Sequence, residues 1–276
     1  MPTTDTRYDR QPVVAGQFYT ADAVALAKEV QAYLSQAEPK GQMQTLLAMA
    51  PHAGYVFSGA VAGATLGHAN LAPTVLLLGP NHTGLGKPFA VWPQGRWHYP
   101  GGSLEVDAEL AALLLERETR LEPDTAAHAR EHSLEVLIPF LAALNPHTRI
   151  VPIAVAQPGA ETLVSVGKMI GRALRAFERP VSIVVSSDMS HFLTQEEAQE
   201  QDGKALDPIM ALDPAQFYAT VRDQQISMCG VMPMTVGLAA AIELGASVPE
   251  ITAYATSGEV NGDTSRVVGY AGLVIS

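Results

Sequence analysis

Three apolar segments of this sequence each end in residues that could bind a metal or move a proton. His52 follows one such segment in "PHAGY", and His82 follows the next in "PNHTG". Asp188 and His191 follow a third segment in "SSDMSHF". Pro, Asn and Gly favour turns, so turn formation alone is one explanation of the first two stretches. The repetition favours another explanation, in which several imidazoles are brought to one place.

A single cysteine, Cys229, adds a third type of ligand. It stands in "SMCGVMPM", just before an apolar segment with Pro233 near the start of an expected helix. A helix N-terminus favours a thiolate, although a buried cysteine can also act as a small apolar residue. Two imidazoles and a thiolate form a three-ligand metal set with positions left open for catalysis. The sequence has no CxxC or HExxH signature that would support this set locally.

His132 lies in "AREHSLEVLIPF", between two acidic residues. If the segment is helical, His132 and Glu135 share a face. The stretch could be a solvated acidic surface, or His132 could enter the pocket as a proton donor or acceptor near neutral pH. We assign no role to the other four histidines, which are His68, His98, His128 and His147.

The hydrophobic pattern predicts the elements that must position these residues. Helices are expected at 20–37, 58–69, 107–118, 131–144, 159–177, 194–225 and 231–245, with Thr20 as the N-cap of the first and a kink at Pro139. Strands are expected at 45–50, 74–79, 88–93, 149–156, 181–187, 250–258 and 266–275.

Apolar strands that alternate with helices indicate a mainly parallel sheet covered on both faces. The last two strands lack a crossover helix and are expected to pair antiparallel. We therefore expect a single-domain α/β/α sandwich with a central mixed sheet over 1–276. Ligands in such folds bind beyond the carboxyl ends of the strands, where the polar residues above are expected.

Composition limits the classes of function. The net charge of −11 argues against a general nucleic-acid-binding surface, which requires clustered Lys and Arg. No apolar run approaches the roughly 20 residues that span a bilayer. The polar start "MPTTDTRYDRQP" cannot be the apolar part of a signal peptide, and one cysteine forms no internal disulfide. These features predict a cytoplasmic protein.

Seven ordered motifs give the chain a resemblance to the MEMO family, also called AmmeMemoRadiSam system protein B. They are "VAGQFY", "PHAGYVFSG", "LGPNHTG", "EHSLEVLIPFL", "SSDMSHF", "MCG" and "SGEVNGDTSRVVGYAG", and they extend over essentially the whole chain. The resemblance implies a fold similar to class III extradiol (LigB-type) dioxygenases, which are non-haem Fe(II) enzymes. Those enzymes hold iron with two His and one carboxylate.

The MEMO pattern has a cysteine at the carboxylate position, so the resemblance implies a metal-ligand set of His52, His82 and Cys229. His191 and Asp188 match further pocket residues of the family, and His132 matches the His of its "EHS" motif. Fe(II) is the expected metal. Cu and Zn are alternatives because a thiolate is a softer ligand than a carboxylate.

Three functions fit these residues. The first is a metal-dependent redox enzyme acting on a small chelating substrate, with His191 as acid or base, Asp188 orienting it and His132 assisting proton transfer. The second is a non-catalytic adaptor that holds a peptide or small ligand in the same pocket. The third is catalysis by a Cys229 nucleophile. The family name further implies radical-SAM and AMMECR-type protein partners.

Overall fold

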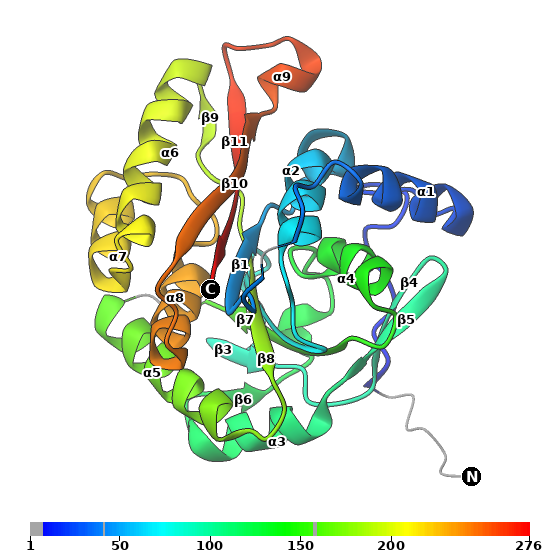
Figure 1. Ribbon diagram of the computed structural model, residues 1–276, viewed down its shortest axis with the longest axis vertical. Coiled ribbons are helices and arrows are strands. Elements are labelled where there is room, and N and C mark those ends of the chain that lie inside the picture. Colours follow the sequence, from blue (N-terminus) through cyan, green and yellow to red (C-terminus); the bar gives the residue numbers. More distant parts are fainter. Residues whose placement is uncertain (1–7, 41, 157–158) are drawn as a thin grey trace.

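The computed structural model describes residues 8–40, 42–156 and 159–276. The first seven residues of the polar N-terminal stretch lie outside these ranges. The described residues form one α/β domain in which helices cover both faces of a central sheet (Figure 1). None of the helices in this part of the chain combines the length and the apolarity that crossing a bilayer requires.

The sheet has the strand order β10-β11-β1-β8-β2-β7-β3-β6. The bounds of these strands are β1 Leu47–Ala50, β2 Thr74–Pro80, β3 Phe89–Val91, β6 Glu122–Pro123, β7 Arg149–Val155, β8 Val181–Ser186, β10 Pro249–Thr256 and β11 Val267–Ile275. Three shorter strands lie off this path: β4 Arg96–Tyr99 pairs with β5 Gly102–Val106, and β9 His191–Leu193 pairs with β11.

The four central strands β1, β8, β2 and β7 run parallel to one another. Ala50 of β1 lies opposite Ser186 of β8, and Pro80 of β2 lies opposite Val155 of β7. The carboxyl ends of these strands therefore share one edge of the sheet. β11 is antiparallel to both β1 and β10, which confirms the expected mixed sheet.

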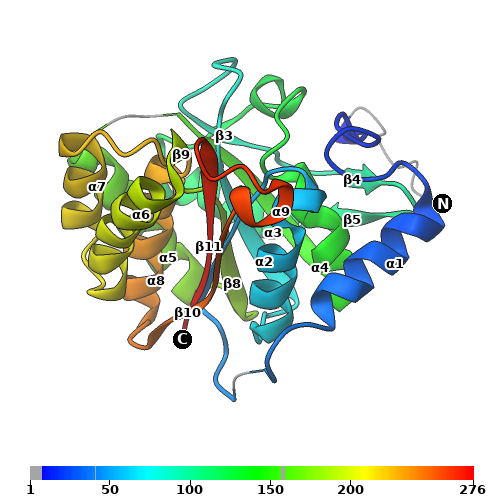
Figure 2. The ribbon, with the colours of Figure 1, turned by 90° about the horizontal axis from the view of Figure 1, so that it is seen from above.

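The helices divide between the two faces. Figure 2 shows α5 to α8 on one side of the sheet and α1, α2 and α4 on the other. Their bounds are α1 Ala23–Leu34, α2 Tyr55–His68, α3 Ala108–Arg117, α4 Ile138–Leu144, α5 Ala160–Ala176, α6 Gln195–Met210, α7 Pro214–Asp223, α8 Val231–Leu244 and α9 Gly258–Asn261, with 3-10 turns at Ala126–His128 and Glu135–Leu137.

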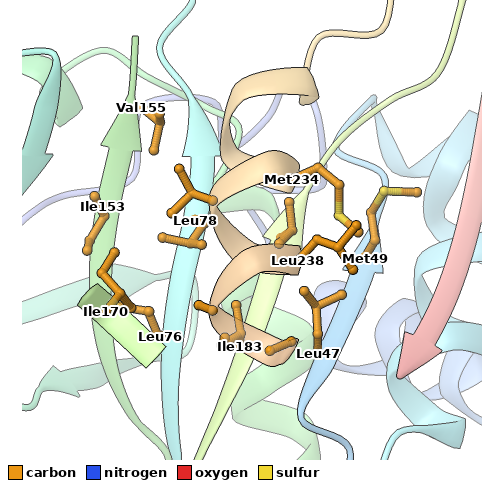
Figure 3. Packing of buried hydrophobic residues seen from close by; sticks show 14 of the residues in the cluster. Leu47, Met49, Leu76, Leu78, Ile153, Val155, Ile170, Ile183, Met234 and Leu238 are labelled. Atoms are coloured by element: carbon orange, nitrogen blue, oxygen red, sulfur yellow. The ribbon is translucent and has the colours of Figure 1, made fainter. Parts of the chain in front are cut away.

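Alternating side chains of each central strand enter two separate cores, because successive residues of a strand point to opposite faces. Leu47 and Met49 pack beneath α8, where Met234 and Leu238 meet them (Figure 3). Ala48 and Ala50 belong to the other core, formed with α1, α2 and α4. Burial on both faces explains why these strands are almost entirely apolar.

Three local predictions were wrong. The first helix begins at Ala23, and its cap is Asp22 rather than Thr20, since the Asp22 carboxylate accepts a hydrogen bond from the Ala25 N–H at 2.8 Å. Residues 131–134 are not helical. Pro139 lies in the first turn of α4 and causes no kink there, since that position needs no N–H donor.

Candidate metal centre

His52 follows β1 at the carboxyl edge of the sheet and is only 2% exposed. The Ser186 hydroxyl donates its single proton to the Ser133 carbonyl at 2.6 Å. Ser186 Oγ must therefore accept from His52 Nδ1, which lies 2.8 Å away. Burial, followed by the neighbouring imidazoles of His82 and His132, lowers the pKa of His52 well below its usual value. The ring is thus neutral, carries its proton on Nδ1, and has a free lone pair on Nε2.

His82 lies in the turn that follows β2. The turn is closed by the Asn81 side chain, whose Oδ1 accepts hydrogen bonds from the N–H groups of Thr83 and Gly84. His82 Nδ1 lies 2.9 Å from Oε1 of Glu131, and the His82 backbone N–H donates to Oε2 of the same carboxylate at 2.6 Å. Glu131 therefore fixes both the backbone and the ring, and in the neutral ring Nε2 is left free.

The Glu131 carboxylate is ionised despite being buried. Burial alone would raise its pKa, but hydrogen bonds and charge from His82, together with the Ser133 N–H, outweigh burial and hold the pKa at about 2. The N–H groups of His132 and Ser133 donate to Oε1 at 3.0 and 2.9 Å. One carboxylate thus organises the loop that carries His132 and the ring of His82. Carboxylates in this position commonly orient metal-binding imidazoles.

His52, His82 and His132 form the group of potential ligands that the described residues bring within reach of one metal ion. One ring nitrogen from each lies within 4.8 Å of the others. The His82 and His132 rings are stacked with centroids 4.8 Å apart, and His52 meets both edge-on. Burial lowers the pKa of His132, which keeps its ring neutral near pH 7. Neutral imidazoles suit Fe, Cu and Zn, so the donors fit the expected metals.

Cys229 lies beside this group, with its Sγ 3.3 Å from His52 Nε2. The Asp188 N–H donates to the sulfur at 3.1 Å. Gly230 allows the start of α8 to approach the end of β8 closely, because a Cβ at that position would lie 2.2 Å from the Cβ of Ser187. The Gly230 N–H also donates to the Ser187 hydroxyl. The start of α8 is thereby held against the end of β8.

At Cys229, burial outweighs the effect of the helix N-terminus in the metal-free protein. Burial, followed by the charge of Asp188, raises the pKa of the Cys229 thiol. The thiol is therefore protonated at neutral pH, which disfavours a free nucleophile. Any metal that binds the sulfur must displace its proton.

Asp188 holds the segment that carries His52. Its Oδ1 accepts from the backbone N–H groups of His52 at 2.7 Å and Ala53 at 3.3 Å, and its Oδ2 lies 3.9 Å from His52 Nε2. Burial raises the pKa of this carboxyl, and the two backbone hydrogen bonds oppose the increase.

His191 is oriented by Ser227, a role that we expected of Asp188. The His191 backbone N–H donates to the Ser227 hydroxyl at 2.7 Å, and His191 Nδ1 lies 2.9 Å from the Ser227 carbonyl oxygen. A carbonyl only accepts, so Nδ1 carries a proton and the neutral ring has a free Nε2. His191 is close enough for its charge to influence the pKa values of both His52 and Asp188.

The six candidate residues of the sequence thus lie in one region, but several of their partners were missed. Glu131 was noted only as a flanking acid, and Ser186 and Ser227 attracted no attention. Phe18, whose ring centroid lies 4.6 Å from that of His132, was also missed. Glu131, the acidic residue before His132, was the one sequence signal for these partners. A serine at the end of a strand, such as Ser186, gives no such signal.

Comparisons with known proteins identify the family of the chain. Residues 10–274 match the family model described as Memo-like protein. The chain is 40% identical to a MEMO1 family protein of Methanopyrus kandleri, over 96% of this chain and 98% of the relative. It is 39% identical to one from Methanococcoides burtonii and 38% identical to one from Aquifex aeolicus, over 96% of this chain and 99% and 98% of those relatives. The chain belongs to the MEMO family.

Proposed function

We propose that this protein is a metal-dependent oxidoreductase related to extradiol dioxygenases, with His52, His82 and Cys229 as its metal ligands and Fe(II) as its metal. The observation that supports this proposal best is the arrangement of hydrogen bonds behind the two imidazoles. Ser186 holds Nδ1 of His52 and Glu131 holds Nδ1 of His82, so that Nε2 of each ring is the atom left to bind a metal. Both rings are thereby prepared to bind a cation without rearrangement.

Cys229 completes the set in this proposal. Its sulfur is already 3.3 Å from His52 Nε2, and the start of α8 holds it there. His132 offers a nitrogen at a similar place, and we assign it to proton transfer because its neutral ring can accept or donate near pH 7. The alternative ligand set, with His132 in place of Cys229, is distinguished by the experiment below.

The other residues of the site have distinct tasks. When bound, the metal supplies a Lewis-acidic, redox-active centre for a small chelating substrate such as a catechol or enediol. His191 accepts the substrate proton at its free Nε2, since Ser227 holds the proton of Nδ1. Asp188 keeps the His52 backbone in place. His82, with a side chain 35% exposed, lies at the open side of the site where a substrate enters.

Metal content tests the proposal. Protein purified without oxygen should contain close to one Fe or Cu per chain. His82→Ala and Cys229→Ser should lose most of it, whereas His132→Gln and the exposed control His147→Gln should retain it. If His132→Gln loses the metal and Cys229→Ser retains it, the third ligand is His132 rather than Cys229. Wild-type protein that remains metal-free and ignores added Fe(II) and Cu(I) would refute the metal enzyme.

An adaptor function remains the competing class. It predicts that the metal-loaded protein turns over no diol under reducing conditions. It also predicts that substitutions of the pocket residues abolish binding of a peptide. Radical-SAM and AMMECR-type proteins are the partners we propose for either class, and co-purification from native extracts tests them.

A further inference from the structure

The N-terminal strap, which we define as residues 10–19, is fastened to the loop that carries Glu131 and His132. That loop, residues 129–134, contains no helix or strand. Its backbone hydrogen bonds join near neighbours in the sequence, such as the Glu131 N–H to the His128 carbonyl at 3.3 Å. Since Glu131 orients His82, any contact that fixes this loop also influences the orientation of His82 at the proposed metal site.

Arg10 makes the principal connection. Its guanidinium spreads over three acceptors: Nε donates to the His128 carbonyl at 3.0 Å, Nη2 to the Glu131 carbonyl at 2.6 Å and Nη1 to the Glu135 carboxylate at 2.7 Å. The guanidinium also stacks on the Trp97 ring at 4.4 Å. Arg10 is 3% exposed, and Glu135 is fully buried.

Glu135 completes the connection from the other side. Its carboxylate accepts from the backbone N–H groups of Val13 and Val14 and from the Tyr19 hydroxyl. Burial, followed by the charge of Glu135, raises the pKa of Tyr19, which therefore remains an O–H donor. Among the described residues, every donor to Glu135 belongs to the strap, and both carboxylate oxygens are occupied by these hydrogen bonds rather than available for proton chemistry with His132.

The same strap places an aromatic ring on the site. Phe18 lies with its ring centroid 4.6 Å from that of His132. Its carbonyl accepts from the Tyr55 N–H at the start of α2 at 2.8 Å, and its own N–H donates to the Val14 carbonyl at 2.9 Å. The strap is therefore attached both to the loop and to the helix that follows His52.

We propose that Arg10 is a positioning residue for the metal centre, acting through the backbone of Glu131 on the orientation of the His82 ring. The metal-binding part of this inference rests on the proposed function, whereas the orientation of His82 does not. Arginine suits the role because its planar fork reaches three separate acceptors in fixed directions. A lysine could keep the ion pair with Glu135, but its single ammonium cannot also reach both carbonyls.

The test uses the full-length, metal-free protein with its histidines labelled with ¹⁵N. Long-range ¹H–¹⁵N spectra report which ring nitrogen carries the proton. In the wild type, His82 should be protonated on Nδ1. In Arg10→Lys the ion pair remains but the hold on Glu131 is lost, so His82 should become a mixture of both tautomers, and Arg10→Met should show the larger change.

A matched control is Arg120→Lys. Arg120 also makes a forked pair, with Glu118, but on another part of the protein. This variant should leave the His82 spectrum unchanged. In the metal titration, Fe(II) affinity of Arg10→Lys should fall by about tenfold, within the range known for outer partners of metal ligands, while Arg120→Lys should bind as the wild type does.

The outcomes are separable. A folded Arg10→Lys with the wild-type His82 tautomer and metal affinity overturns the positioning role and leaves Arg10 a structural ion pair only. A wild type in which His82 is protonated on Nε2 also overturns it. If the wild type binds no metal, the proposed function fails, and the His82 tautomer still decides the role of Arg10.

Discussion

His82 Nδ1 lies 2.9 Å from Oε1 of Glu131, and the same carboxylate accepts the backbone N–H of His82 at 2.6 Å. The turn after β2 and the loop before α4 are thus joined through one buried acid. This contact sets the direction of the His82 ring and with it the free nitrogen of the proposed metal site.

Replacing Glu131 by Gln should weaken metal binding. The amide has the same size, but its NH2 group cannot accept the N–H donors that surround the carboxylate. Loss of such an outer partner typically lowers affinity about 10- to 100-fold. Calorimetric titration with Fe(II) under argon measures the effect. Glu122→Gln, at an exposed ion pair with Lys87, is the control. Equal affinities in the two variants would show that Glu131 does not orient a ligand.

Cys229 should react slowly with iodoacetamide. Because burial and Asp188 raise the pKa of its thiol, the alkylation rate at neutral pH should lie well below that of the unfolded chain. The rate should continue to rise beyond about pH 8.5, the usual cysteine value, without levelling off. The sequence holds one cysteine, so mass spectrometry reports this site alone. Fast labelling that levels off below that pH would instead support a nucleophile.

His128 should make the fold sensitive to mild acid. The ring is buried between Trp92 and Trp97, and burial lowers its pKa from 6.5 to about 4. Below pH 6.5 the unfolded chain therefore binds a proton that the folded chain does not. This contribution to the free energy of unfolding is present at neutral pH and is lost as the pH falls from 6.5 to about 4.

The effect can be isolated with His128→Gln. Between about pH 7.5 and about pH 5, wild-type stability in urea should fall by about 2 kcal/mol more than that of the variant. His147→Gln, at an exposed site, should show the wild-type fall. The pH-dependent difference is the relevant quantity, since the variant has a lower stability throughout. Parallel pH profiles for wild type and His128→Gln would contradict the assignment.

Gly230→Ala should destabilise the fold where α8 meets β8. The added Cβ would lie 2.2 Å from Ser187 Cβ, so the helix start or the strand end must shift, at about 1–3 kcal/mol. Ser187→Gly in the same chain should restore much of this loss. Gly203→Ala is the contrasting control, because nothing lies within 4 Å of the new methyl group and alanine favours a helix. Urea unfolding that ranks the two alanine variants equally would be inconsistent with this packing.

The sequence predicted most of the fold because its central strands are apolar on both faces. Such runs as 74–79 and 181–187 have few alternatives to a buried parallel sheet. The hairpin of β4 and β5 was missed since its residues are mixed in polarity and carry no strong alternation. The apolar run 136–144 suggested a helix that begins at Glu131, whereas residues 131–134 form a loop and the Glu135 carboxylate binds the strap 10–19.

The candidate site was predictable to the extent that strand ends meet at one edge. His52, His82, Asp188 and His191 all follow central strands, and topology alone brings them together. The hydrogen bonds that orient them were not predictable. Arg10 contacts residues more than 110 positions away in the sequence, and nothing near Arg10 indicates such a partner.

Anomalous diffraction from crystals of protein purified without oxygen tests the central claim most directly. Data collected at the absorption edge of the bound metal should show one peak within about 2.0–2.3 Å of His52 Nε2, His82 Nε2 and Cys229 Sγ. The His82 Nδ1 contact to Glu131 should remain intact. No peak at this position, or a metal bound through Nδ1 of either histidine, would contradict the account.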